Sequence, residues 1–255
     1  MSRIAGLDIG SRSIELAVVQ GGRVLHAARL PTTFSPVAQC RKLLEGVVIQ
    51  GLVATGYGRD LALKLDLGLP VRKVTEIKAH AAGAAHFFPS ARTVLDIGGQ
   101  DTKAIALLEN GRVGKFEMND RCAAGTGKFL EYTASVFQMP VEEFGAFALR
   151  GKNPPTINSM CTVFAETEAT SLMAEGAEPE DIALGLHRAI VRRTLNMLTR
   201  VGLQAPLVFV GGVANNPCVR MLLAGELGLA PGEGLLLPDE PDMTGAVGAA
   251  LLGLE

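Results

Sequence analysis

Apolar residues alternate with polar or small residues in three short runs near the start of the chain, a pattern typical of β-strands. The runs cover residues 4–8, 13–19 and 24–30, and short turns at residues 10–12 and 21–22 separate them. Turns of this length join antiparallel neighbours, because parallel strands need a long crossover. We therefore expect a three-stranded antiparallel meander.

The same succession of runs returns later in the chain, at residues 93–96, 103–108 and 113–118. Both copies begin with Leu-Asp-Ile-Gly, at positions 7–10 and 95–98, and both continue with small or polar residues in the first turn. Self-similarity of this kind indicates an internal duplication.

After each meander the spacing of apolar residues changes from two toward 3.6, which predicts helices. Meander, then helices and parallel strands, twice over, predicts an α/β protein of two lobes with a cleft between them. We expect lobe I to comprise residues 1–92 and 244–255, and lobe II residues 93–243. A Rossmann fold is not favoured, because it would place a helix directly after the first glycine turn. The expected helices are 36–44, 60–67, 76–86, 126–137, 162–174, 179–201, 217–227 and 243–252, and the expected further strands are 52–55, 71–74, 207–210 and 235–237.

Each Leu-Asp-Ile-Gly turn places an aspartate, Asp8 or Asp96, at the end of a strand, followed by residues without bulky side chains. Backbone N–H groups in such turns can surround phosphate oxygens, while the carboxylate holds Mg²⁺ through its waters. One such turn alone is equally well explained as ordinary turn chemistry. Two facing copies favour a grip on one triphosphate from both sides. The expected phosphate-binding residues are Gly10, Ser11, Arg12 and Ser13 in the first copy and Gly98, Gly99 and Gln100 in the second.

A third glycine motif follows the apolar run at residues 207–210 and leads into a helix that begins with Pro217. Small residues there would let a nucleoside base lie against the backbone, and the candidates are Gly211, Gly212, Asn215 and Asn216. The alternative is a tight packing turn between strand and helix. Residues 244–250 predict a helix with a face of glycine and alanine, which suits close contact between helices.

Four phrases in this order, DIGGQDTKAI, MNDRCAAGTGKFLE, CTVFAETEATSLMAEG and GGVANNPCV, resemble a known family. They look like the activator ATPases of 2-hydroxyacyl-CoA dehydratases and the ATP-binding subunits of benzoyl-CoA reductases, within the superfamily of actin, heat-shock chaperones and sugar kinases. The resemblance implies duplicated ribonuclease-H-like lobes in an actin-like ATPase fold. It also implies that hydrolysis of ATP to ADP drives a low-potential electron from ferredoxin or flavodoxin onto an acyl-CoA dehydratase or reductase component. The second phrase adds Gly125, Thr126 and Gly127 to the expected nucleotide-binding residues.

Two cysteines, Cys122 and Cys161, lie in these phrases just before predicted helices. A helix N-terminus stabilises a thiolate and an anionic sulfur cluster. Two thiolates cannot complete the shell of a cubane, but a twofold dimer would supply two more. The resemblance thus implies a homodimer with one shared [4Fe–4S] cluster. Small buried hydrophobes, or a monomer using all four cysteines, remain alternatives, and we expect structural roles for Cys40 and Cys218.

For hydrolysis we expect Asp8 and Asp96 to hold the Mg²⁺ shell, and Gln100 or Asp101 to orient the attacking water. A small-molecule kinase of the same fold is the main rival function, and an ATP-binding module without a redox role is another. His187, on the predicted long helix, is best explained as part of a solvated face.

The composition narrows the classes of partner. Hydrophobic residues make up 48% and charged residues 20%, and the formal net charge is −2, so a nucleic-acid-binding surface is not expected. No apolar run reaches the ~18 residues of a membrane span. Asp8 interrupts the first apolar run and no cleavage-like site follows it, which argues against a signal peptide. We expect a cytoplasmic protein that binds neither nucleic acid nor membrane.

Overall fold

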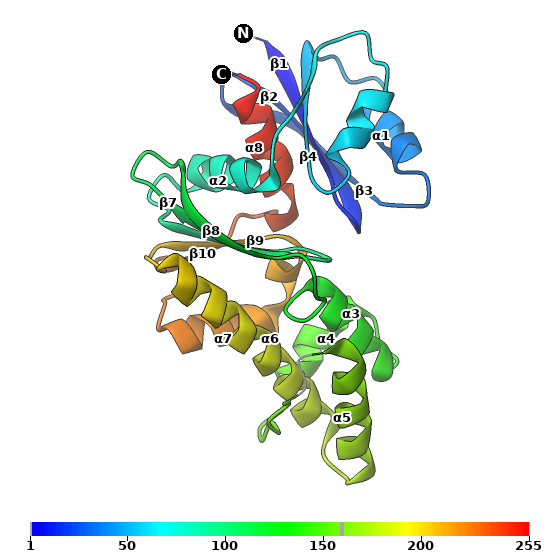
Figure 1. Ribbon diagram of the computed structural model, residues 1–255, viewed down its shortest axis with the longest axis vertical. Coiled ribbons are helices and arrows are strands. Elements are labelled where there is room, and N and C mark those ends of the chain that lie inside the picture. Colours follow the sequence, from blue (N-terminus) through cyan, green and yellow to red (C-terminus); the bar gives the residue numbers. More distant parts are fainter. Residues whose placement is uncertain (1, 159–160, 255) are drawn as a thin grey trace. The chain divides into compact units, whose positions relative to one another are not determined.

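The computed structural model describes residues 2–158 and 161–254. The chain forms two compact units, each made from separate stretches of sequence. The first unit contains Met1–Val94, Ile105–Lys115 and Pro238–Glu255, and the second contains Leu95–Ala104 and Phe116–Leu237. Figure 1 shows the elements coloured along the chain.

The first sheet has the strand order β3-β2-β1-β4-β5. Its first three strands pair antiparallel, which confirms the predicted meander, and β4 and β5 continue the sheet in parallel from β1. The strands are β1 (Arg3–Ile9), β2 (Ser13–Gln20), β3 (Arg23–Pro31), β4 (Gly51–Thr55) and β5 (Val71–Lys73).

Helices cover both faces of this sheet (Figure 1). Helix α1 (Pro36–Leu44) packs on one face, where Leu7, Leu16 and Leu52 belong to one buried apolar cluster. Helix α8 (Thr244–Leu252) packs on the other face, and α2 (Glu76–Phe87) packs against α8. Successive residues of a strand point to opposite faces, so alternate positions of β1 and β2 face α8.

The glycine face predicted for residues 244–250 makes these contacts possible. A Cβ on Gly248 would lie 1.8 Å from the carbonyl oxygen of Ala79 in α2. On the strand side, a Cβ on Gly6 would lie 1.9 Å from the carbonyl oxygen of Ala246. Side chains at either position would therefore force the backbones apart.

The second sheet repeats the first in its strand order, β8-β7-β6-β9-β10. Strand β6 takes the place of β1, β7 of β2, and β9 of β4. This order confirms the duplication that the sequence predicted. The strands are β6 (Thr93–Ile97), β7 (Thr102–Leu107), β8 (Val113–Asn119), β9 (Leu207–Val210) and β10 (Leu235–Leu236).

The second unit also contains the longest helix described, α6 (Pro179–Val201), which packs against α4, α5 and α7. It ends at Gly202, whose φ of 77° is the left-handed conformation that glycine accepts without strain. No helix among the described residues is long and apolar enough to cross a bilayer. The other helices here are α3 (Gly127–Val136), α4 (Val141–Ala148), α5 (Thr162–Ala174) and α7 (Pro217–Leu227), and the short 3-10 turns of the chain are η1 (Arg59–Lys64), η2 (Gly212–Asn215) and η3 (Pro241–Met243).

Two elements differ from the prediction. The segment 60–67, expected as an α-helix, forms only the 3-10 turn η1. Helix α4 was not predicted. A glycine, Gly145, interrupts its pattern, and the structure shows why glycine is needed there: a Cβ would lie 2.5 Å from Oδ1 of Asn216.

Candidate functional site

The first predicted phosphate turn joins β1 to β2 and is closed by backbone hydrogen bonding. The N–H of Gly10 donates to the carbonyl of Ser13 at 3.0 Å, and the Thr32 hydroxyl donates to the carbonyl of Gly10 at 2.8 Å. Ser11 lies partly exposed and Arg12 exposed at the tip of the turn. The turn therefore has a fixed backbone with accessible residues at its tip.

Asp8, just before this turn, is buried at the start of α8. Its carboxylate lies so close to Gly56 and Gly245 that a Cβ on either glycine would come within 2.4 and 2.0 Å of its oxygens. Gly245 is in the first turn of α8, where the helix dipole favours a negative charge. The two glycines thus leave space for the carboxylate at the end of β1.

The second turn has the same construction. The N–H of Gly98 donates to the carbonyl of Asp101 at 3.0 Å, matching the bond from Gly10 to Ser13. Asp96 is buried, and a Cβ on Gly211 would lie 2.4 Å from its Oδ1, as one on Gly56 would from Oδ1 of Asp8.

A lysine that the sequence analysis did not single out completes the second turn. Nζ of Lys103 lies 3.0 Å from Oδ2 of Asp96 and 2.8 Å from Oδ2 of Asp101, and the Lys103 side chain is 1% exposed. A buried lysine has to be paired, because the charge is costly to remove from water. The signal available in the sequence was a charged residue inside an otherwise apolar strand.

Residues 125–127, expected to bind nucleotide, lie directly beside the second turn. The N–H groups of Gly127 and Lys128 donate to the carbonyls of Gly98 and Gly99, each at 2.8 Å. The Thr102 hydroxyl donates to the carbonyl of Gly125 at 2.6 Å. The first N–H groups of α3 therefore hold the turn in place.

In the third glycine motif, Gly212 and Asn215 are exposed, whereas Asn216 is buried. Oδ1 of Asn216 accepts from the N–H of Val219 at 3.0 Å and so caps α7, and its Nδ2 lies 3.0 Å from Nε2 of His187. Both ends of this amide serve the packing of α7. Gly212 and Asn215 are the members of the motif that remain accessible.

The expectation that His187 lies on a solvated face is wrong. The side chain is fully buried, with Nδ1 2.8 Å from the carbonyl oxygen of Ala183. Burial lowers the pKa of His187 to about 4, so the ring is neutral at pH 7. A neutral ring that donates from Nδ1 accepts at Nε2 the hydrogen bond of Asn216.

The four cysteines fall into two classes. Cys40 and Cys218 are buried, and burial raises their pKa to about 11 and about 12, so they remain thiols. Cys122 and Cys161 are exposed. Exposed thiols are the ones available as metal ligands.

The two exposed cysteines precede helices that contact each other. Cys161 is the N-cap residue of α5, and Cys122 lies in the loop before α3. The hydroxyl of Tyr132 in α3 donates to Oε2 of Glu166 in α5 at 2.5 Å. Helices α3 and α5 therefore hold both cysteine-bearing segments in one part of the second unit.

Asn119, whose role the sequence did not indicate, organises the loop of Cys122. Its Nδ2 donates to the carbonyls of Cys122 and Ala124, both at 2.9 Å, and Arg193 of α6 lies 3.5 Å from its Oδ1. The Arg193 stem also passes Gly125, where a Cβ would lie 2.9 Å from it. The loop is thus fixed through its backbone, which leaves the Cys122 thiol exposed.

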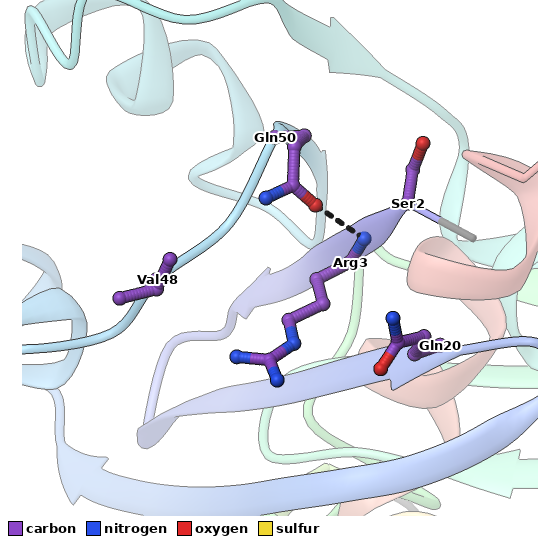
Figure 2. Close-up of a pocket in the computed structure, with 5 residues that line it drawn as sticks. All are labelled: Ser2, Arg3, Gln20, Val48 and Gln50. Atoms are coloured by element: carbon purple, nitrogen blue, oxygen red, sulfur yellow. Dashed lines mark hydrogen bonds between the residues drawn. The ribbon is translucent and has the colours of Figure 1, made fainter.

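A shallow hollow of about 440 Å³ lies elsewhere, at the opposite end of β1 from the phosphate turn (Figure 2). One hydrogen bond crosses it, from the backbone N–H of Arg3 to Oε1 of Gln50 at 2.5 Å. None of the predicted site residues lines it. The lining residues are Ser2, Arg3, Gln20, Val48 and Gln50.

Residues 5–253 match the BadF/BadG/BcrA/BcrD ATPase family. The chain belongs to this ATPase family. Among its relatives, the 2-hydroxyisocaproyl-CoA dehydratase activator of Clostridioides difficile is 36% identical over 98% of this chain and 94% of its own. The (R)-2-hydroxyglutaryl-CoA dehydratase activating ATPase of Acidaminococcus fermentans is 35% identical over 96% and 95%. A component of the benzoyl-CoA reductase of Thauera aromatica is 28% identical over 99% and 93%.

Solved structures confirm the fold class of this ATPase. The activator of the 2-hydroxyisocaproyl-CoA dehydratase from Clostridium difficile, with bound ADPNP, superimposes with a TM-score of 0.87 at 36% identity, covering 98% of this chain and 93% of its own. Component A of the Acidaminococcus fermentans (R)-2-hydroxyglutaryl-CoA dehydratase gives 0.89 at 34% identity, covering 99% and 97%. A glucokinase from Streptomyces griseus gives 0.61 at 16% identity and shows the shared actin-like fold alone.

Proposed function

We propose that this ATPase activates a 2-hydroxyacyl-CoA dehydratase or a related acyl-CoA reductase component by coupling ATP hydrolysis to the transfer of a low-potential electron. Relatives that match nearly the whole chain are named as dehydratase activators, which supports the class of partner. Ferredoxin or flavodoxin is the proposed donor of the electron.

The division of the cysteines is the observation that carries the electron-transfer part of the proposal. Only Cys122 and Cys161 are exposed, and they precede two helices in contact, α3 and α5. A [4Fe–4S] cluster needs four thiolates, so two exposed cysteines fit it if a second copy of the chain contributes the same pair. When bound, such a cluster accepts and releases one electron.

The nucleotide-binding residues are proposed from the two phosphate turns and the third glycine motif. Gly10 to Ser13 and Gly98 to Gln100 would bind phosphate oxygens, and Gly212 and Asn215 are accessible to a nucleoside. For the attacking water, Gln100 is the better candidate of the two expected, since the Asp101 carboxylate is already ion-paired with Lys103. Asp8 and Asp96 are the proposed partners of the Mg²⁺ shell.

Hydrolysis is needed because the electron is transferred uphill. Each ~59 mV of one-electron potential corresponds to about 1.4 kcal/mol, so raising an electron by roughly 300 mV takes about 7 kcal/mol. Hydrolysis of ATP to ADP and phosphate can supply this amount. The contribution of this chain is to bind the nucleotide and to hold the two cysteine segments through Asn119 and the contact between α3 and α5.

The test is iron and sulfide analysis of protein purified without oxygen, together with its mass in solution. We expect a brown homodimer with about four irons per dimer. Cys122→Ala and Cys161→Ala should each abolish the cluster, because each removes two ligands per dimer. Cys40→Ala and Cys218→Ala are the matched controls and should retain it.

Two outcomes would contradict the proposal. A colourless monomer that hydrolyses ATP would refute the electron-transfer role and make a small-molecule kinase the better reading. Loss of iron in Cys40→Ala would refute the shared site, because a buried thiol of the first unit would then be a ligand.

A further inference from the structure

Three polar side chains lie side by side at the end of the first sheet, on neighbouring strands. Glu15 of β2 is directly opposite Asp8 of β1, and Thr55 of β4 is in register with Asp8 on its other side. Neighbouring strands lie about 4.8 Å apart, so residues in register have adjacent side chains. Glu15, Asp8 and Thr55 are called the first row below.

All three side chains point to the face of the sheet that α8 covers. The residues next to them in sequence, Ile9, Ile14 and Ala54, belong to the apolar cluster on the opposite face, with α1. The close approach of the Asp8 carboxylate to Gly245 of α8 agrees with this direction. The first row therefore lies between the sheet and the start of α8.

The first row contains two buried atoms that lack a hydrogen-bond partner. Among residues 2–158 and 161–254, the buried side-chain oxygen and nitrogen atoms without a partner are Oε1 of Glu15 and Oγ1 of Thr55. Glu15 is 4% exposed and Thr55 0%. Buried polar atoms are normally paired, so two of them on either side of one carboxylate indicate a missing ligand.

The nearest cation on the neighbouring strand does not compensate the row. Arg29 of β3 is opposite Glu15, but its guanidinium is bonded to Asp242, which precedes α8. Burial raises the pKa of Glu15 to about 7, with a further rise from Asp242, while Ser13 and Arg29 lower it. The carboxyl group thus lacks the positive partner that a buried carboxylate requires.

The second copy of the duplication shows what fills the same place there. Lys103 occupies the position of Glu15, seven residues after the aspartate in each copy, and its ammonium group is bonded to Asp96. Val210 occupies the position of Thr55, since the glycine after each approaches its aspartate equally closely, at 2.4 Å from Oδ1. The second row carries its own cation and an apolar neighbour, so it is complete without a ligand.

We propose that the first row binds a divalent metal cation, in the place that the Lys103 ammonium group occupies in the second row. Oε1 of Glu15, the carboxylate of Asp8 and Oγ1 of Thr55 are the ligands. Hard oxygen donors with two negative charges suit Mg²⁺ or Mn²⁺. The site lies within the first unit and needs no nucleotide, so it stands independently of the proposed function.

The test uses Mn²⁺ as the probe with the full-length protein free of nucleotide. Binding is followed by the loss of the free Mn²⁺ signal in electron paramagnetic resonance. We expect wild-type protein to bind, and Glu15→Gln and Thr55→Val each to weaken binding by about tenfold or more, because each removes a ligand. Glu226→Gln removes the same charge from an exposed position of α7 and should bind like the wild type.

A double variant, Glu15→Lys with Thr55→Val, copies the second row into the first. We expect it to bind no Mn²⁺ and to have a melting temperature that Mn²⁺ does not change, whereas Mn²⁺ raises that of the wild type. The inference is overturned if wild-type protein binds no Mn²⁺ at millimolar concentration, or if Glu15→Gln and Thr55→Val bind as the wild type does. Binding of a fluorescent ATP analogue, measured separately, shows whether the nucleotide site survives either result.

Discussion

At the scale of single residues, equivalent positions in the duplication have different chemistry. Asp8 and Asp96 end corresponding strands and approach corresponding glycines, yet the residue opposite Asp8 is Glu15, whereas Asp96 is bonded to Lys103. The two aspartates therefore differ in what they contribute to stability, even where both contribute to turnover.

We predict that Asp8→Asn and Asp96→Asn both lower MgATP turnover, by about 10–100-fold, because each removes a charge proposed to face Mg²⁺. Asp96→Asn should also lower the free energy of unfolding by about 3 kcal/mol, since it takes a partner from buried Lys103. Asp8→Asn should not, because it relieves the repulsion by Glu15. Turnover assays and urea denaturation measure the two effects, with the exposed Asp239→Asn as control. Equal stability of the two variants would contradict this assignment.

At the scale of elements, the junction of α6 and α7 depends on one buried histidine. His187 of α6 accepts a hydrogen bond from Asn216, which caps α7, and its ring packs 4.8 Å from that of Phe144 in α4. The three helices therefore meet at a side chain that must be neutral to make these contacts.

We predict that acidification weakens this junction. The folded pKa of His187 is about 4, below the ordinary 6.5, so between these values the unfolded chain binds a proton that the folded protein does not. The free energy of unfolding should fall as the pH falls through this window, by up to about 3 kcal/mol. Urea denaturation at pH 7 and pH 4 would show a smaller fall in His187→Leu than in the wild type. His86→Leu, at an exposed position, should keep the wild-type fall, and parallel curves for all three would disprove the idea.

Most elements could be predicted from the sequence because their periodicity is local. Helices α5, α6 and α7 have the predicted bounds, and both turns lie where the repeated Leu-Asp-Ile-Gly residues place them. The burial of Lys103 and His187 could not be predicted, because it depends on partners distant in sequence. Helix α4 was missed for a related reason, since Gly145 reads as a helix breaker until its contact with Asn216 is known.

At the scale of the whole molecule, the proposed function requires that nucleotide changes the shape of the protein. ATP bound by turns from both units would favour the conformation in which both reach it, and only such a difference in affinity can shift a population. We predict that small-angle scattering profiles differ with and without a nonhydrolysable ATP analogue in the presence of Mg²⁺. The Asp8→Asn variant should show a smaller difference. Superimposable wild-type profiles would indicate a rigid body and rule out the coupling.

The packing of the last helix on the first strand has a consequence for biosynthesis. Strand β1 emerges from the ribosome first, but the α8 face of its sheet is covered only after residues 244–252 have been made. At ~5–20 residues per second, this face stays open for roughly 10–50 s in every nascent chain. During that time its apolar residues are available to chaperones and to other nascent chains. Ribosomes stalled before residue 244 should therefore carry a first unit that proteases cut readily, whereas the released chain resists them.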